Sequence, residues 1–174
     1  MNHAFRSTLL AALLIAALPA QAAMYNFNGT LDSGLSAGQS FSGNVSFDDS
    51  SLLGSGQEWL GANSFSIDFL GNTYYMAQGA AATELAFLDG NFLGVSYSYD
   101  AAFPMFSLIA SSGTGEPWDL PALAYSQMGI NGVVDGAGTI MYQAVPEPET
   151  YAMLLAGLGL LGIMGRRRQS KRAA

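Results

Sequence analysis

Apolar and polar residues alternate along much of the chain between residues 23 and 144. Phe65, Ile67 and Phe69 alternate with serine and aspartate, and the stretch 91–99 has the same two-residue period. This period places successive side chains on opposite faces, as in a strand with one buried face. No long segment of this region has the 3.6-residue period of an amphipathic helix. The pattern therefore predicts an all-β domain.

Turn residues separate the predicted strands. Asp48-Asp49-Ser50-Ser51, Gly71-Asn72 and Asp89-Gly90 are each typical of a tight turn. Gly43 lies inside a predicted strand and indicates a β-bulge there. Strands are predicted over 25–29, 41–47, 64–69, 73–77, 84–88, 91–99, 103–109 and 138–143, with loops around Trp59 (52–62) and Trp118 (111–121). Many short strands with frequent turns favour an antiparallel β-sandwich or a jelly roll, and no motif excludes a small barrel.

The first residues have the features of a secretory signal peptide. A positively charged start is followed by an apolar run over 9–18 and by Pro19. Ala20-Gln21-Ala22 then provides small residues around a cleavage site, so we expect a signal peptide over 1–22 and a mature chain beginning at Ala23. The apolar run is too short for a permanent membrane span.

The charge distribution restricts what the exported domain, residues 23–144, is able to do. The six Lys and Arg residues and the one His lie outside this domain, and the chain has no Cys. Of the thirteen acidic residues, Glu147 and Glu149 lie beyond the domain, which leaves eleven within it and a formal charge of −11. Nucleic-acid binding requires cations, and Ser-His-Asp or Cys-His catalysis requires histidine. We therefore expect no nucleic-acid partner, no cofactor and no metal centre built from His and Cys.

The last thirty residues have three distinct parts. Val145-Pro146-Glu147-Pro148 is stiff because proline lacks an amide donor and favours extended geometry in the preceding residue. The apolar stretch 151–165 follows, and as a helix it would extend about 23 Å, short of the roughly 30 Å hydrocarbon core. It spans a bilayer if the bilayer thins and the following Arg166-Arg167-Arg168 snorkel. These arginines predict a cytoplasmic C-terminus.

This tail resembles the PEP-CTERM sorting signal of Gram-negative bacteria. The resemblance covers only the tail and is carried by Val145-Pro146-Glu147-Pro148, the glycine-containing apolar stretch, and Arg166-Arg167-Arg168. It implies processing by an exosortase, a membrane protease-transpeptidase, near the Pro-Glu-Pro motif. It also implies an association with exopolysaccharide and biofilm production. The expected organisation is a signal peptide (1–22), a β-rich exported domain (23–144), a sorting signal with a transmembrane helix (145–169) and a short cytoplasmic tail (170–174).

Trp118 is the candidate sugar contact of the exported domain, since aromatic rings beside Asp suit a neutral sugar face. Trp118 lies in Gly115-Glu116-Pro117-Trp118-Asp119. The strand tyrosines are better explained as core residues, because aromatics contribute large buried areas to β-sheets. Asp48-Asp49 lacks the ligand spacing of a calcium loop and fits a turn. No catalytic residues and no metal ligands are assigned.

The sequence therefore predicts a non-enzymatic exported protein with a structural or adhesive role at the cell surface or in the exopolysaccharide matrix. Its expected partners are the secretion machinery, signal peptidase, an exosortase and exopolysaccharide. One alternative is a carbohydrate-binding module that uses Trp118. Another is a glycosidase that uses two carboxylates, although the sequence gives no means of choosing the pair.

Overall fold

The computed structural model describes residues 22–146, 155 and 157–159. Within these residues the chain forms nine strands, two short 3-10 helices and part of a C-terminal helix. The elements in chain order are β1 (Ala22–Leu31), β2 (Ser40–Asp48), η1 (Asp49–Ser51), β3 (Gln57–Phe69), β4 (Asn72–Tyr75), η2 (Met76–Gln78), β5 (Glu84–Leu88), β6 (Asn91–Tyr99), β7 (Met105–Ile109), β8 (Ala122–Gly129) and β9 (Gly132–Val145). The all-β prediction is confirmed.

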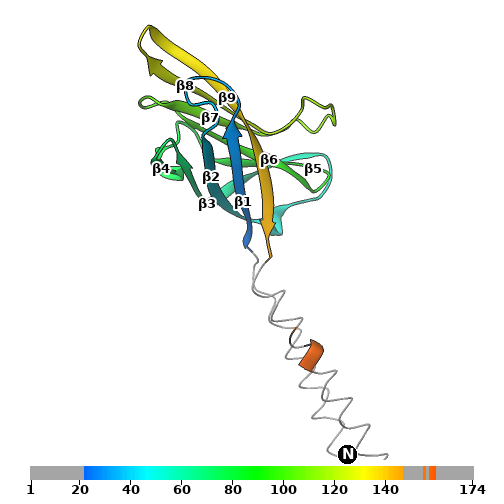
Figure 1. Ribbon diagram of the computed structural model, residues 1–174. Coiled ribbons are helices and arrows are strands. Elements are labelled where there is room, and N and C mark those ends of the chain that lie inside the picture. The colour runs from blue at the N-terminus through cyan, green and yellow to red at the C-terminus, as the bar shows by residue number, and fades with distance from the viewer. Residues whose placement is uncertain (1–21, 147–154, 156, 160–174) are drawn as a thin grey trace, which may run out of the picture.

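The strands form one antiparallel sheet that closes into an eight-stranded barrel (Figure 1). The order around the ring is β2-β1-β9-β8-β7-β6-β5-β3, and β3 also pairs with β2. Closure depends on β3, since its first part (57–61) pairs with β5 and its second part (62–68) with β2. The prediction of a sandwich or jelly roll is therefore corrected, because strands that pair around a full ring do not separate into two facing sheets.

Inward-pointing aromatic side chains fill the barrel. Phe27, Phe65 and Tyr97 are each at most 3% exposed. The Phe65 and Tyr97 ring centroids are 4.4 Å apart, within the range of favourable aromatic pairs. The Tyr97 hydroxyl donates a hydrogen bond to the Tyr75 carbonyl at 3.2 Å, which gives its polar end a partner. The core thus forms from the period-two residues that the sequence pattern indicated.

Glycines inside the strands allow aromatic rings to lie across the neighbouring backbone. Phe27 pairs with Gly43 across β1 and β2, and Phe41 pairs with Gly29 on the same two strands. A methyl group on either glycine would overlap the ring of its partner. Gly43 therefore allows the Phe27 ring to pack closely against the β2 backbone. The β-bulge predicted at Gly43 is wrong. The irregularity lies instead between Ser46 and Phe47 of β2.

Other differences concern strand boundaries. Trp59 lies in β3, not in a loop, and the whole of β8 was absent from the predicted strands. Both predicted hairpins form, with Leu70-Gly71 and Asp89-Gly90 all at positive φ as a tight turn requires. The first turn lies one residue earlier than the predicted Gly71-Asn72, since Asn72 already belongs to β4. Within the described residues, no helix has both the length and the apolar character needed to cross a membrane. Most of the expected span, 151–165, lies outside those residues.

Gly43→Ala is expected to destabilise the barrel. The added methyl group overlaps both the Phe27 ring and the Ser66 carbonyl, and overpacking of this kind costs about 1–3 kcal/mol. Gly61→Ala is the matched control, since Gly61 also lies in a strand but its added methyl group would meet open space. Chemical denaturation gives the free energy of unfolding of both variants. A loss no larger for Gly43→Ala than for Gly61→Ala would contradict this account of the packing.

Candidate functional site

The two ends of the barrel domain lie side by side at one end of the ring. β1 and β9 pair along their length, and Met24 near the start of β1 lies opposite Val145 at the end of β9 (Figure 1). Ala22 and Ala23, at the expected signal cleavage site, already belong to β1, where Ala23 lies opposite Phe47. Pro146 is the first residue after β9. Both expected processing positions therefore adjoin the same pair of strands.

The other predicted processing residues lie outside the described part of the chain. These are Ala20, Glu147, Pro148, Arg166, Arg167 and Arg168. What the structure adds is the position at which the tail begins. Since Ala144 and Val145 are paired with β1, almost no linker separates the barrel from the Pro-Glu-Pro segment.

Trp118 lies in the loop between β7 and β8, as predicted, and its side chain is 79% exposed. The neighbouring Asp119 holds this loop together. Its carboxylate accepts hydrogen bonds from the Ser112 N–H at 2.6 Å and from the Thr114 N–H and hydroxyl at 2.7 and 2.9 Å. The Ser112 hydrogen bond is the main cause that holds the pKa of Asp119 well below its usual range. These hydrogen bonds hold the loop backbone in place, while the Trp118 side chain remains exposed.

Beside this loop the barrel wall has a gap, which we call the seam. It lies between residues 91–95 of β6 and 140–145 of β9. β8 begins at Ala122, opposite Thr139, so β9 continues beyond its partner. β6 in turn pairs with β7 only from Tyr97 onwards. No described strand fills the space between these two segments.

Tyr142 bridges the seam. From β9 its hydroxyl accepts a hydrogen bond from the Val95 N–H of β6 at 3.1 Å. The Ser111 N–H donates to the Leu93 carbonyl at 3.1 Å, and the Ile140 N–H donates to the Pro121 carbonyl at 3.3 Å. Side-chain and loop groups therefore replace part of the missing strand pairing, as buried backbone groups require.

A cleft of about 420 Å³ opens at the seam. We call it the seam cleft. Its lining includes Tyr25, Asn91, Phe92, Asp119, Pro121 and Tyr142. The rings of Tyr25 and Phe92 stack at 4.2 Å between centroids, and Tyr142 meets Phe92 edge-on at 5.0 Å. Burial raises the pKa of Tyr25 and raises that of Tyr142 to about 12, so both hydroxyls stay protonated at neutral pH.

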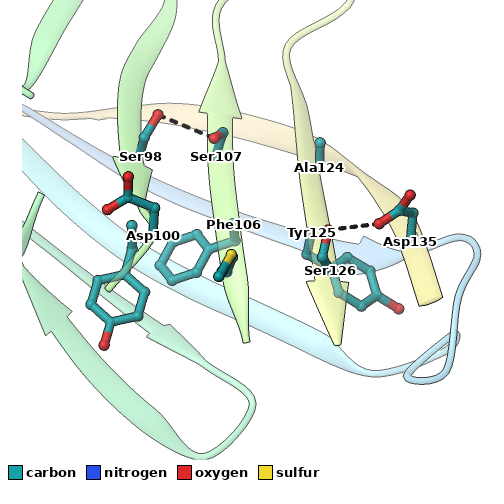
Figure 2. Close-up of a pocket in the computed structure, with 11 residues that line it drawn as sticks. Ser98, Asp100, Phe106, Ser107, Ala124, Tyr125, Ser126 and Asp135 are labelled. Carbon is teal, nitrogen blue, oxygen red and sulfur yellow. Dashed lines mark hydrogen bonds between the residues drawn. The ribbon is translucent and has the colours of Figure 1, made fainter. Parts of the chain in front are cut away.

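A second hollow of about 440 Å³ lies on the outer face of β6, β7, β8 and β9 (Figure 2). Its floor carries hydroxyl groups: Ser107 donates to Ser98 at 3.1 Å, and Ser126 donates to the Asp135 carboxylate at 2.6 Å. Asp100 follows β6 and Asp135 lies on β9, on opposite sides of the hollow, with β7 and β8 between them (Figure 2). This arrangement is an open polar surface with separated carboxylates.

Three carboxylates elsewhere, those of Asp48, Glu58 and Asp89, hold turns and loops. The Asp48 side chain accepts from the Ser50 N–H at 2.9 Å and caps η1. Glu58 accepts from the backbone N–H groups of Leu53, Gly54 and Ser55. In the described part of the chain, no three Asp, Glu, His or Cys side chains gather where they could hold a metal ion. The turn interpretation of Asp48 fits this geometry.

The fold and its continuous last strand define a β-barrel that leads directly into a C-terminal tail. Residues 144–168 of that tail match the family model of the PEP-CTERM protein-sorting motif. The chain therefore carries a PEP-CTERM protein-sorting motif at residues 144–168. The motif implies an exported protein that is held transiently at the membrane and processed by an exosortase. Comparison with curated proteins and with solved structures finds no match.

Sequence reasoning located the tail and Trp118 but missed the seam cleft. Tyr25 and Tyr142 alternate like core residues, and the pattern does not show that β9 continues beyond β8. The one available signal is the difference in length between β8 and β9. Had a strand been predicted over Ala122–Gly129, the longer β9 would have extended beyond it, and its end would have had no partner on that side.

Tyr142→Phe is expected to destabilise the seam, because it leaves the Val95 N–H without an acceptor. An unpaired buried donor costs about 1–3 kcal/mol. The amide of Val95 should exchange faster with solvent, and the free energy of unfolding should fall. Tyr99→Phe is the control, since the Tyr99 hydroxyl has no hydrogen bond within the described residues. Unchanged exchange at Val95 in Tyr142→Phe would refute the bridge.

The same hydroxyl contributes to the pH dependence of stability. Burial raises the folded-state pKa of Tyr142 to about 12, above the usual value of about 10. A phenol with a raised folded pKa contributes stability that is complete below pH 10 and is lost as the pH rises to about 12. Tyr142→Phe should therefore flatten the alkaline loss of stability relative to the wild-type protein, as measured by chemical denaturation at a series of pH values.

Asp119→Asn is expected to loosen the Trp118 loop without unfolding the barrel. An amide cannot accept at both positions that the carboxylate oxygens occupy. The Ser112 and Thr114 amides should exchange severalfold faster, and Trp118 fluorescence anisotropy should fall. The order that Asp119 gives this loop should persist in mild acid and be lost only as the pH falls through its lowered pKa. Glu116→Gln in the same loop is the control, and equal effects of the two variants would contradict the assignment.

Proposed function

We propose that this protein is a non-enzymatic surface protein with a structural or adhesive role at the cell surface or in the exopolysaccharide matrix of a biofilm. It is exported with its signal peptide removed at Ala22–Ala23 and is held at the membrane with the C-terminus in the cytoplasm. An exosortase then cuts near Pro146-Glu147-Pro148 and releases the barrel to the outside. The observation that carries this proposal is the match of residues 144–168 to the sorting motif.

The continuity of β9 with the motif supports the order of these events. The motif match begins at Ala144, which is still paired with Tyr25 of β1. Cutting within the Pro-Glu-Pro segment leaves every β1–β9 pair intact, so the released domain keeps its closing strand. The barrel would therefore survive removal of the tail.

The use of the acidic side chains supports a role without catalysis. Residues 23–144 contain no His, Lys, Arg or Cys. Asp48, Glu58, Asp89 and Asp119 each accept hydrogen bonds from backbone N–H groups of turns and loops. A general acid or base must instead reach the substrate and carry a pKa suited to proton transfer. These carboxylates organise loops, which favours a binding or structural domain over a glycosidase.

The charge of the domain restricts what it adheres to. A formal charge of −11 with no cation over 23–144 repels anionic polymers, whereas hydroxyl and aromatic groups suit neutral ones. A neutral part of the exopolysaccharide is therefore the matrix component that we expect as partner.

Replacement of Pro146, Glu147 and Pro148 by alanine is expected to block processing. The intact mass of the released wild-type protein should correspond to a chain that begins at Ala23 and ends within or near the motif. The triple variant should remain full-length at its C-terminus and stay in the inner membrane. Thr150→Ala, two residues after the Pro-Glu-Pro segment, serves as control and should be processed normally. Normal release of the triple variant would overturn the exosortase step.

A further inference from the structure

We propose that the seam cleft binds a neutral saccharide, with its aromatic rings packed against the sugar and its hydroxyl, amide and carboxylate groups hydrogen-bonded to the sugar hydroxyls. The inference rests on the adhesive role proposed above, since it names the ligand class and the site through which adhesion acts. Within the described part of the chain, the seam is where β6 and β9 face each other without a strand between them.

The aromatic surfaces of the cleft differ from those of the core. Phe27 and Phe65 are 1% and 3% exposed, whereas Tyr25, Phe92 and Tyr142 are only partly buried and line an open cleft. The near-parallel stack of Tyr25 on Phe92, at an interplanar angle of 24°, fixes the orientation of both rings. Rigid aromatic faces beside convergent polar groups are typical of small-ligand sites, and a volume of about 420 Å³ lies within their range.

The polar groups of the cleft are those that hydroxyl-rich ligands require. The Tyr25 hydroxyl has no hydrogen bond within the described residues, and Tyr142 uses its oxygen as an acceptor from Val95, so its proton remains available for donation. Asn91 is exposed at the start of β6, and its amide nitrogen donates to the Leu88 and Asp89 carbonyls at 3.3 and 3.4 Å, which leaves its amide oxygen as an acceptor. Asp119 adds a carboxylate that is held in place by Ser112 and Thr114. Donors and acceptors are thus both present around the rings.

Charge excludes anionic ligands from this site. The only ionised side chain among the residues that line the cleft is Asp119, which is negative. No Lys, Arg or His occurs between residues 23 and 144. A phosphate, sulfate or uronate group would find no cationic side chain and would be repelled by the carboxylate. The ligand is therefore a sugar without an acidic substituent.

An added peptide strand does not fit the seam as well as a sugar. Strand addition requires unpaired backbone groups along an edge. Here the Val95 N–H, the Leu93 carbonyl and the Ile140 N–H are already bonded. The Tyr142 side chain also crosses the space that an inserted strand would occupy. These contacts favour a ligand that binds side chains over one that pairs with the backbone.

Leu120 lines the cleft, and Trp118 extends the apolar surface beside it. They are 60% and 79% exposed, and Trp118 directly precedes Asp119, whose side chain lines the cleft. A sugar chain longer than the cleft itself would therefore continue over the Trp118 loop. Trp118, the sugar contact predicted from the sequence, therefore lies at the rim of the seam cleft and not at its centre.

The test is affinity electrophoresis of the full-length protein, kept in a detergent without a sugar headgroup. The gels contain one of a panel of neutral glucans, mannans and galactans, or polygalacturonate as an anionic polymer. We expect retardation by at least one neutral polysaccharide and none by polygalacturonate. Tyr25→Phe and Asn91→Ala should each weaken the retarding interaction about 3–10-fold, as expected for one lost hydrogen bond. Trp118→Ala should weaken retention of long chains more than that of short oligosaccharides.

Trp59→Ala is the matched control, because Trp59 is a 48% exposed tryptophan on β3 and does not line the cleft. Near-ultraviolet circular dichroism of every variant shows whether the barrel is folded. The proposal is overturned if no neutral polysaccharide retards the folded protein, or if Trp59→Ala weakens binding as much as the cleft variants. It is also overturned if polygalacturonate or reduced, alkylated casein binds in a cleft-dependent way. A protein that is processed and displayed but fails this test would overturn the cleft assignment alone, since processing is measured separately by intact mass.

Discussion

The pairing of β1 with β9 is the interaction on which the rest of the structure depends. It joins the first and last strands of the domain, from Met24 opposite Val145 to Leu31 opposite Gly138, and so closes a ring that the consecutive hairpins alone would leave open. The same pairing sets both chain ends at one end of the barrel. The described chain therefore enters and leaves the barrel on the same side.

A mismatch in strand length then produces the cleft. β9 runs to Val145, whereas its neighbour β8 begins only at Ala122, opposite Thr139. The end of β9 is thus held by β1 on one side alone, and Tyr142, Ser111 and Pro121 satisfy backbone groups that a further strand would have paired. The aromatic rings at this point cannot be fully enclosed, since the wall is incomplete beside them. Barrel closure and an exposed aromatic cleft are therefore consequences of the same strand.

Local alternation was enough to predict the strands over 64–69 and 91–99, because each has one clearly apolar face. It failed for β8, Ala122–Gly129, where Leu123 and Tyr125 are buried but the apolar neighbours Ala122, Ala124 and Met128 do not mark a solvent face. It also placed Trp59 in a loop, since the glycines around it are typical of turns. The choice between a sandwich and a barrel depends on two pairings, β1 with β9 and β2 with β3, which join residues such as Val45 and Phe65 that no local pattern records.

The sorting tail can likewise be recognised from the local sequence, whereas the seam cleft cannot. A sorting motif acts as a linear segment, so its order of Pro-Glu-Pro, apolar stretch and arginines is visible in the sequence, and the family match over 144–168 agrees with it. The cleft joins Tyr25, Phe92 and Tyr142, which lie far apart in the chain and are individually indistinguishable from core aromatics. The sequence does restrict the chemistry of the cleft, because residues 23–144 contain no cationic side chain. Any site that this barrel forms must therefore act through aromatic faces, hydroxyls, amides and carboxylates, and the seam is a place where the topology brings all of these together at the surface.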